Sequence, residues 1–186
     1  MRKILAILII IILAGGYFYY LNNNDNEEKT IRKKEELTKF EKIIQLNEYQ
    51  DEFYSPNEVV ERNNIILLYL YGGELADDEE IRELIRIQRN LLDPDLLEIN
   101  PYEEQIEKVR LKVEEYKESG YKIIEIRQDV VKYEASNPKI AIIKVIQYTN
   151  SNTDNYLEYY LRQQENGTWR ILAWEIVDEF SILNEF

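Results

Sequence analysis

The stretch YLEYYLRQQENGTWRILAWEIV, from Tyr156 to Val177, contains the strongest hairpin signal of the chain. Two runs rich in aromatic and branched aliphatic residues flank Asn166-Gly167, a dipeptide typical of the two-residue type I′ loop. The sequence therefore predicts an antiparallel hairpin in which Glu165 pairs with Thr168.

In such a hairpin, alternate residues of each strand share one face of the sheet. The face predicted to point at the core pairs Leu157 with Ile176, Tyr159 with Trp174, Leu161 with Leu172 and Gln163 with Arg170. The opposite face pairs Tyr156 with Val177, Glu158 with Glu175, Tyr160 with Ala173 and Arg162 with Ile171.

This outward face admits three interpretations, because the carboxylates of Glu158 and Glu175 would repel each other there unless a cation screens them. It can be a solvated sheet surface. It can be a contact for a protein partner or a second copy, since its apolar and aromatic content is high for a solvated surface. The residues of this predicted partner face are Tyr156, Glu158, Tyr160, Ile171 and Glu175. The third interpretation, a carboxylate pair for acid–base chemistry or a divalent cation, is disfavoured because a convex sheet face offers no enclosed pocket.

The rest of the chain places helices before this hairpin. Helices are predicted over 56–71, 78–92 and 101–118, with a capping box at Ser55 to Glu58 and a further helix start at Asp93-Pro94. Strands are predicted over 121–135 (bulged near Gln128), 139–149, 156–164 and 168–177. This order predicts an α+β fold with three or more helices packed on one face of a curved four-stranded antiparallel sheet.

The N-terminus carries a membrane signal. Arg2 and Lys3 precede an uncharged run from Ile4 to Leu21, which as a helix would be roughly 27 Å long at about 1.5 Å per residue, close to the thickness of a bilayer core. A signal peptide cleaved after Gly16 is the alternative, but the apolar run continues past that site.

We therefore expect a transmembrane signal anchor at 1–21, a polar linker and juxtamembrane helix at 22–54, and an α+β domain at 55–186. The basic residues before the span favour a cytoplasmic N-terminus and an extracytoplasmic C-terminal domain in the cell membrane.

Composition narrows the possible chemistry. The chain has no histidine and no cysteine, which excludes disulfides, thiolate nucleophiles and a Ser-His-Asp triad. With 36 acidic and 23 basic residues the formal net charge is -13, which disfavours nucleic-acid binding. The acidic runs fit helix N-termini better than metal sites. We expect no catalytic, cofactor or metal site.

One polar residue falls at a helix position expected to be buried. Asn63 has the spacing of Val59, Ile66 and Leu67 on the predicted 56–71 helix. It is either a core amide satisfied by the backbone or water, or a polar group that lines a cleft between helices and sheet. The candidate residues of that pocket are Asn63, Tyr116, Tyr148 and Tyr159.

The element order and the segment Gly167-Thr168-Trp169-Arg170-Ile171, a G-x-W-+-I pattern, resemble the nuclear-transport-factor-2-like (cystatin-like) fold. The GGYFYY end of the anchor, the SPNEVVERNN helix start and the WRILAWEIVD ending are similar to small uncharacterised membrane-anchored proteins of Firmicutes. The resemblance implies helices over a curved sheet. It transfers no activity, because catalytic members of the superfamily use an Asp or His that has no matched position here.

The sequence thus predicts a single-span, membrane-anchored extracytoplasmic binding or assembly module without catalysis. The architecture also resembles single-span assembly subunits of type IV secretion systems. One alternative is a small-ligand-binding or weakly catalytic pocket in the cone of the fold. Another is a sensor whose juxtamembrane helix reports on the domain.

Overall fold

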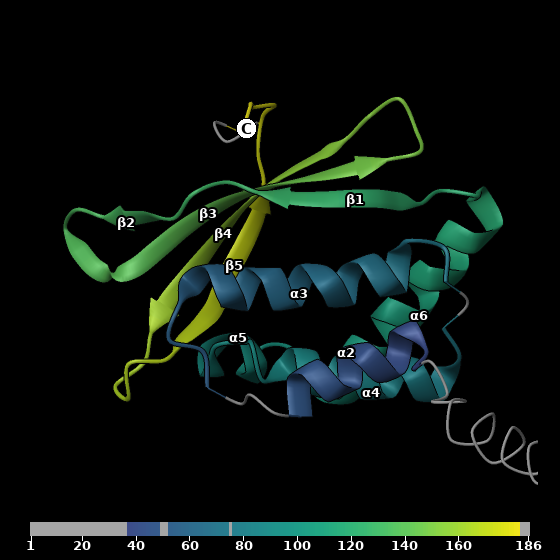
Figure 1. The fold of residues 1–186 in the computed structure, drawn as a ribbon, viewed down its shortest axis with the longest axis horizontal. Helices are drawn as coiled ribbons and strands as arrows, with labels where there is room; N and C mark the ends of the chain where they lie inside the picture. Colours follow the sequence, from purple (N-terminus) through teal and green to yellow (C-terminus); the bar gives the residue numbers. More distant parts are fainter. Residues whose placement is uncertain (1–36, 49–51, 75, 183–186) are drawn as a thin grey trace, which may run out of the picture. The chain divides into compact units, whose positions relative to one another are not determined.

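The computed structural model describes residues 37–48, 52–74 and 76–182 of the chain (Figure 1). The predicted anchor at 1–21 and residues 22–36 of the predicted linker lie outside these ranges. Within them, no helix combines the length and the apolar character needed to cross a membrane.

Helices come first along the described chain and strands follow, which confirms the predicted α+β class. The helices are α2 (Lys39–Glu48), α3 (Pro56–Tyr71), α4 (Asp78–Arg89), α5 (Pro94–Glu98) and α6 (Tyr102–Ser119). The strands are β1 (Ile123–Gln128), β2 (Lys132–Glu134), β3 (Asn137–Thr149), β4 (Asn155–Gln163) and β5 (Trp169–Ile176).

The helix starts differ in how their backbone amides are satisfied. Asp77 and Glu80 form a capping box at α4, where Asp77 Oδ1 accepts from the Glu80 amide at 2.9 Å and Glu80 Oε2 accepts from the Asp77 amide at 3.3 Å. The capping box predicted at Ser55 is wrong, because Ser55 makes no side-chain cap hydrogen bond. Pro56 starts α3 instead, with a φ angle already fixed for a helix.

Helix α2 packs onto the rest of the domain. Ile43 is buried in the hydrophobic core, and the Phe40 ring lies 6.1 Å from the Tyr69 ring of α3. Phe53, between α2 and α3, is fully buried. The compact unit therefore begins at Lys39 and takes in residues that the sequence assigned to the juxtamembrane segment.

The sheet is open and antiparallel, with the order β1-β3-β4-β5, and β2 also pairs with β3. The single strand predicted over 121–135 is two strands, and the interruption follows Gln128, where a bulge was predicted. Asp129 is buried there, and its backbone amide donates to Lys144 O at 2.8 Å.

The β4–β5 hairpin departs from the predicted register near its loop. The Gln164 amide donates to Thr168 O at 2.7 Å, so the loop has three residues, and Gly167 takes a left-handed φ of 85°. This is a type I turn followed by a left-handed residue, and the prediction of a two-residue type I′ loop is wrong.

A β-bulge at Leu172 compensates for the extra loop residue. From Tyr160↔Ala173 to Leu157↔Ile176 the strands pair as predicted, whereas Leu161 pairs with Ile171 and Arg162 with Arg170. The prediction that Ile171 lies on the outward face is therefore wrong: its side chain is 0% exposed, in the core. The offset buries Trp169 and Ile171 and leaves Arg170 on the outward side, which avoids the cost of burying a guanidinium.

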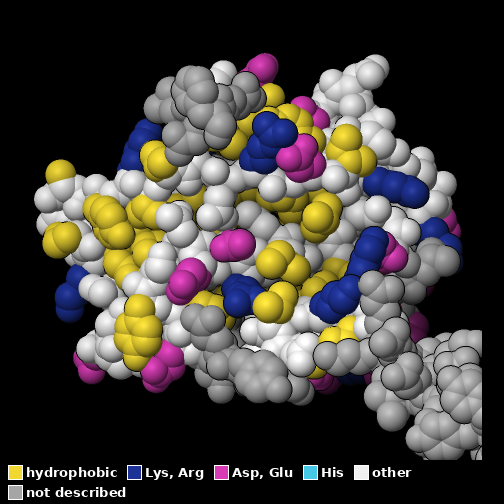
Figure 2. Space-filling model, in the orientation of Figure 1, with side chains coloured by type: hydrophobic (Ala, Val, Ile, Leu, Met, Phe, Trp, Pro, Cys, Tyr) yellow, Lys and Arg dark blue, Asp and Glu magenta, His cyan; other side chains and the backbone are white. Residues whose placement is uncertain are grey.

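The domain has two layers, one of helices and one formed by the twisted sheet (Figure 1). The C-terminal segment lies on the side of the sheet that faces away from the helices. Helix α3 contacts β1, β3 and β5, and α4 and α6 pack beneath it. The core between the layers gathers apolar side chains of α3, α4, β3, β4 and β5. In the same orientation, exposed hydrophobic side chains lie in patches among acidic and basic ones (Figure 2).

Candidate functional site

A cavity of about 210 Å³ lies between the helices and the sheet. Its walls come from α3, α4, α6, β3, β4 and β5. The lining residues are Asn63, Leu67, Tyr71, Gln88, Leu92, Gln105, Gln147, Leu157, Tyr159, Ile171 and Trp174. None of these side chains carries a charge at neutral pH, so the cavity is apolar with amide and hydroxyl groups set into it.

The amides of this cavity form a hydrogen-bonded chain across four elements. Gln105 Nε2 of α6 donates to Gln88 Oε1 of α4 at 3.1 Å, and Gln88 Nε2 donates to Asn63 Oδ1 of α3 at 2.8 Å. Asn63 Nδ2 donates to the Tyr159 hydroxyl of β4 at 3.3 Å. At the other end, Arg89 Nη1 donates to Gln105 Oε1 at 2.9 Å and to the Asn100 carbonyl at 2.7 Å.

Tyr159 closes this chain and is 3% exposed. Its ring is stacked on that of Trp174 with centroids 6.2 Å apart. Burial raises the pKa of the Tyr159 hydroxyl well above its ordinary value, so the group remains protonated at any physiological pH. Tyr159 therefore offers hydrogen bonding and not acid–base chemistry.

The pocket candidates predicted from the sequence separate into two groups. Asn63 and Tyr159 lie together in the cavity, as predicted. Tyr148 alternates with Gln147 on β3 and faces the other side of the sheet, where the Arg127 guanidinium lies 5.4 Å from its ring. The sequence pattern alone does not assign Tyr148 to one face of the sheet, because both faces of β3 carry apolar residues.

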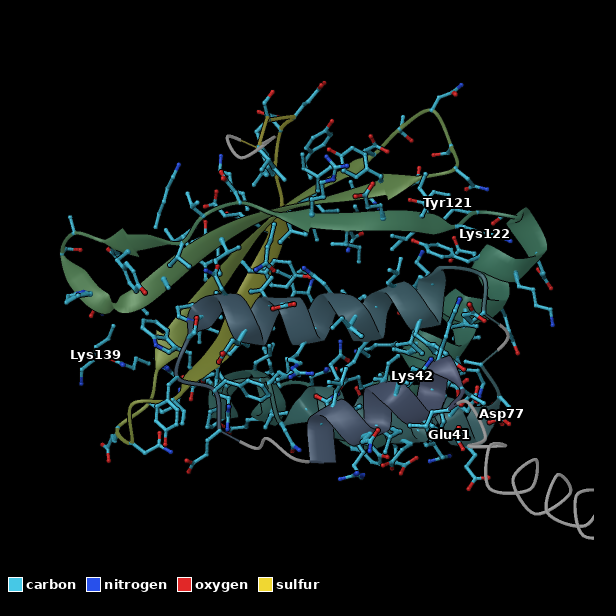
Figure 3. All side chains as sticks on the ribbon, viewed as in Figure 1. Glu41, Lys42, Asp77, Tyr121, Lys122 and Lys139 are labelled. Atoms are coloured by element: carbon cyan, nitrogen blue, oxygen red, sulfur yellow. The ribbon has the colours of Figure 1, made fainter. Side chains whose placement is uncertain are left out.

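Tyr116 lies outside the cavity, in a second pocket of about 330 Å³ at the junction of α6 and β1. Its ring packs between those of Tyr71 and Tyr121, with centroids 5.4 and 4.4 Å away. Asp77, Tyr121 and Lys122 of the same pocket lie at this end of the domain (Figure 3).

Gln88 and Gln105 are site residues that the sequence analysis missed. Gln88 follows Ile81, Leu84 and Ile85 at the i, i+3, i+4, i+7 spacing of a buried helix face, the same signal that singled out Asn63. Gln105 directly precedes buried Ile106. The spacing that singled out Asn63 on its helix therefore also predicts Gln88 at a buried position, whereas Gln105 has no such signal.

The polar side chains on the outward face of the sheet bond to one another more than the sequence predicted. The Tyr160 hydroxyl lies 2.8 Å from Glu158 Oε1 and 2.7 Å from Glu175 Oε1, and these hydrogen bonds raise its pKa. Lys144 Nζ is 3.8 Å from Glu158 Oε2. The Tyr160 hydroxyl thus lies between the two carboxylates of the predicted like-charge pair, and the Lys144 ammonium screens that of Glu158.

The chain's own C-terminal segment also covers part of this face. The Phe180 ring packs edge-on against Tyr156 with centroids 5.3 Å apart, and Lys144 Nζ lies 4.8 Å from the Phe180 centroid. Tyr156 is therefore less available to a partner than the sequence indicated.

The second half of β5 is an open sheet edge. In the first half, the Trp169 amide donates to Phe53 O at 2.7 Å and the Ile171 amide donates to Leu91 O at 2.8 Å, so other segments cover that edge. Past the bulge, the backbones of Trp174 and Ile176 face away from β4, and within the described residues nothing pairs with them.

The side chains at this open edge are apolar. Trp174 is 47% exposed and Ile176 is 80% exposed, although both lie on the helix side of the sheet. Trp174 borders a shallow groove that includes exposed Ile99 and Leu111. In the described part of the chain, unpaired backbone groups and exposed apolar side chains therefore meet at one place.

Comparison with known proteins gives one match. Residues 1–174 match the family described as "Domain of unknown function (DUF6715)". No curated protein and no solved structure matches the chain.

Proposed function

The chain belongs to that family of unknown function, and from this premise we propose that it is a single-span, membrane-anchored extracytoplasmic binding module without catalysis of its own. The uncharged run from Ile4 to Leu21 behind Arg2 and Lys3 supports the anchor and its orientation. Helices on one face of an antiparallel sheet support the proposal that the domain is nuclear-transport-factor-2-like, as in the membrane-anchored Firmicutes proteins it resembles.

The open edge of β5 is the observation that carries the proposal. An edge strand with free backbone groups and apolar side chains is a template for another strand. Trp174 and Ile176 supply the free backbone groups and the exposed apolar side chains. The adjoining groove can receive side chains of an added segment. We therefore propose that the partner contributes an extended segment that pairs with β5.

The chemistry of the interior supports a binding role over catalysis. The cavity is lined by amides, aromatic rings and aliphatic side chains. Its tyrosines Tyr71 and Tyr159 have pKa values raised by burial, so neither can serve as a general base near neutral pH.

Site-specific photocrosslinking tests this proposal. A photoreactive amino acid is placed at Ile176 in the full-length protein in intact cells. The matched control is the same substitution at Ile124, an isoleucine that is 60% exposed on β1, at the other edge of the sheet. We expect a discrete adduct from position 176 and none from 124, and its mass identifies either a second copy or another protein.

Two outcomes contradict the proposal. One is the absence of an adduct at Ile176 in protein whose domain is shown by protease accessibility to be outside the cell. The other is labelling of equal strength at both positions, which indicates non-specific contact.

A second candidate function is the binding of a small ligand in the helix–sheet cavity. The specific observation that favours it is the chain of buried amides, which leads to a hydroxyl in a cavity of about 210 Å³. A benzene ring fits an apolar cavity of roughly 150 Å³, so the space suffices for a one-ring compound.

A further inference from the structure

The amide chain of the cavity has a fixed direction. Arg89 can only donate hydrogen bonds, so the Gln105 atom that faces it must be the oxygen. The Gln105 nitrogen then faces Gln88, and the Gln88 nitrogen in turn faces Asn63. The guanidinium at one end thus sets the orientation of every amide up to β4.

The chain ends with the Tyr159 oxygen as an acceptor. Asn63 Nδ2 donates to that oxygen, because Asn63 Oδ1 is already occupied by Gln88. The hydroxyl hydrogen of Tyr159 is therefore left to donate, and in the part of the chain that the structure describes no acceptor receives it. A buried donor without a partner carries a free-energy cost that a bound acceptor removes.

A second donor borders the same space. Gln147 Oε1 of β3 accepts from Asn155 Nδ2 at 3.2 Å, which leaves the Gln147 amide hydrogens for the cavity that this residue lines. Trp174 and Tyr159 supply aromatic walls, and no charged side chain is among the lining residues. A carboxylate ligand would be desolvated there without a counter-ion.

We propose that the cavity binds a small neutral ligand, of about one ring, through a hydrogen-bond acceptor that receives the hydroxyl hydrogen of Tyr159. The ligand class is thus carbonyl-containing or ether-containing compounds, with an apolar body against Trp174. This inference rests on the second candidate function and adds the chemistry of its ligand.

Acetophenone and ethylbenzene are matched probes, because they share a ring and differ by a carbonyl in place of a methylene. Binding to the full-length protein in lipid nanodiscs is followed by the NMR signal of the Trp174 indole N–H. We expect the wild type to bind acetophenone about tenfold more tightly than ethylbenzene, and Tyr159→Phe to lose this preference. Partition of the probes into lipid is the same for both proteins, so it cancels when the affinity ratio of the wild type is divided by that of Tyr159→Phe.

Asn63→Asp tests the direction of the chain separately. When it is ionised, a carboxylate at position 63 only accepts hydrogen bonds, so it takes the hydrogen of Tyr159 and leaves none for a ligand. Because burial raises the pKa of this carboxyl, binding is compared at a pH high enough to ionise it. We expect this variant to lose the acetophenone preference while Tyr159 is still present. A purely structural role of Asn63 would weaken the binding of both compounds equally.

Each contrary result has a distinct meaning. Equal affinity of the wild type for both probes, or a preference that survives Tyr159→Phe, overturns the donor role of Tyr159 but leaves ligand binding intact. Benzoate that binds more tightly than acetophenone overturns the neutral ligand class. Binding of neither probe up to its solubility limit overturns both this inference and the second candidate function.

Discussion

Asp93 is a carboxylate whose surroundings fix its charge. It is 0% exposed, caps α5 through the Asp95 amide at 3.0 Å, and accepts from Arg162 Nε at 2.9 Å and Gln164 Nε2 at 2.8 Å. Burial acts to raise the pKa of the Asp93 carboxyl, but the hydrogen bonds from Arg162, the Asp95 amide and Gln164 outweigh it and lower the pKa.

We predict that Asp93→Asn lowers the free energy of unfolding by about 2–3 kcal/mol at pH 7, because the amide removes the negative charge and replaces one of the two oxygens that accept from Arg162 by a donor. Asp93 has a folded-state pKa below its unfolded value of about 3.9. The contribution of Asp93 to the free energy of unfolding is therefore complete above the unfolded-state pKa and is lost as the pH falls through the folded-state pKa. Urea unfolding at pH 7 and pH 3 measures the difference between the two proteins, which should shrink at pH 3.

Asp95→Asn is the matched control. The Asp95 carboxylate also contacts Arg162, at 2.7 Å, but its side chain is largely exposed. An exposed ion pair contributes at most about 1 kcal/mol. Equal destabilisation by the two substitutions would show that burial of Asp93 is not the source of its effect.

At the scale of the element, the β4–β5 hairpin shows how two local irregularities offset each other. The three-residue loop shifts the register by one residue, and the bulge at Leu172 shifts it back. The sequence held a signal for this offset. Trp169 and Ile171 are odd-numbered and Trp174 and Ile176 are even-numbered, so the apolar alternation changes phase between them, as expected at a bulge.

We predict that Gly167→Ala lowers the free energy of unfolding by about 1 kcal/mol, because an L-residue is strained at the φ of 85° found there. A Cβ at this position would meet nothing within 4 Å, so the whole effect comes from the backbone. Thermal unfolding followed by circular dichroism measures it. Gly167→Asn should cost less, since asparagine tolerates the left-handed region, and an equal cost for both variants would contradict this explanation.

At the scale of the whole molecule, the proposed anchor determines where the domain acts. We predict that replacing Ile9 and Ile10 by lysine releases the protein from the membrane fraction, because each charge at the centre of a span costs about 2.5–3.5 kcal/mol on insertion. Carbonate extraction of cells that express each form measures the distribution. Replacing Ile9 and Ile10 by leucine is the control and should leave the protein in the membrane pellet. Retention of the lysine variant in the pellet would contradict the anchor.

The described domain is compact around a helix–sheet core, and we propose a different kind of binding for its interior and for its edge. The amide chain joins α3, α4, α6 and β4 inside, whereas the open end of β5 faces outward. Trp174 belongs to both places, since it lines the cavity and stands exposed at the edge. The photocrosslinking experiment at Ile176 and the ligand-binding experiment with Tyr159→Phe therefore test the two proposed functions separately.

Local sequence patterns predicted most of the helices and strands and their order, because caps, turn residues and apolar periodicity act over a few residues. They did not predict that the segment 121–135 forms two strands, β1 and β2. They also placed Asn63 on the buried face of its helix. The register near the loop depends on long-range packing, because the burial of Trp169 and Ile171 against distant helices outweighs the preference of Asn166-Gly167 for a shorter turn.

The assembly of the candidate sites likewise required the tertiary structure. Asn63, Gln88, Gln105 and Tyr159 come from four elements and meet through contacts between residues far apart in the chain. The open end of β5 exists because the covering segments, Phe53 and Leu91, reach only its first half. Local sequence preferences carry no information on such long-range packing, and for that reason the site residues were only partly predictable.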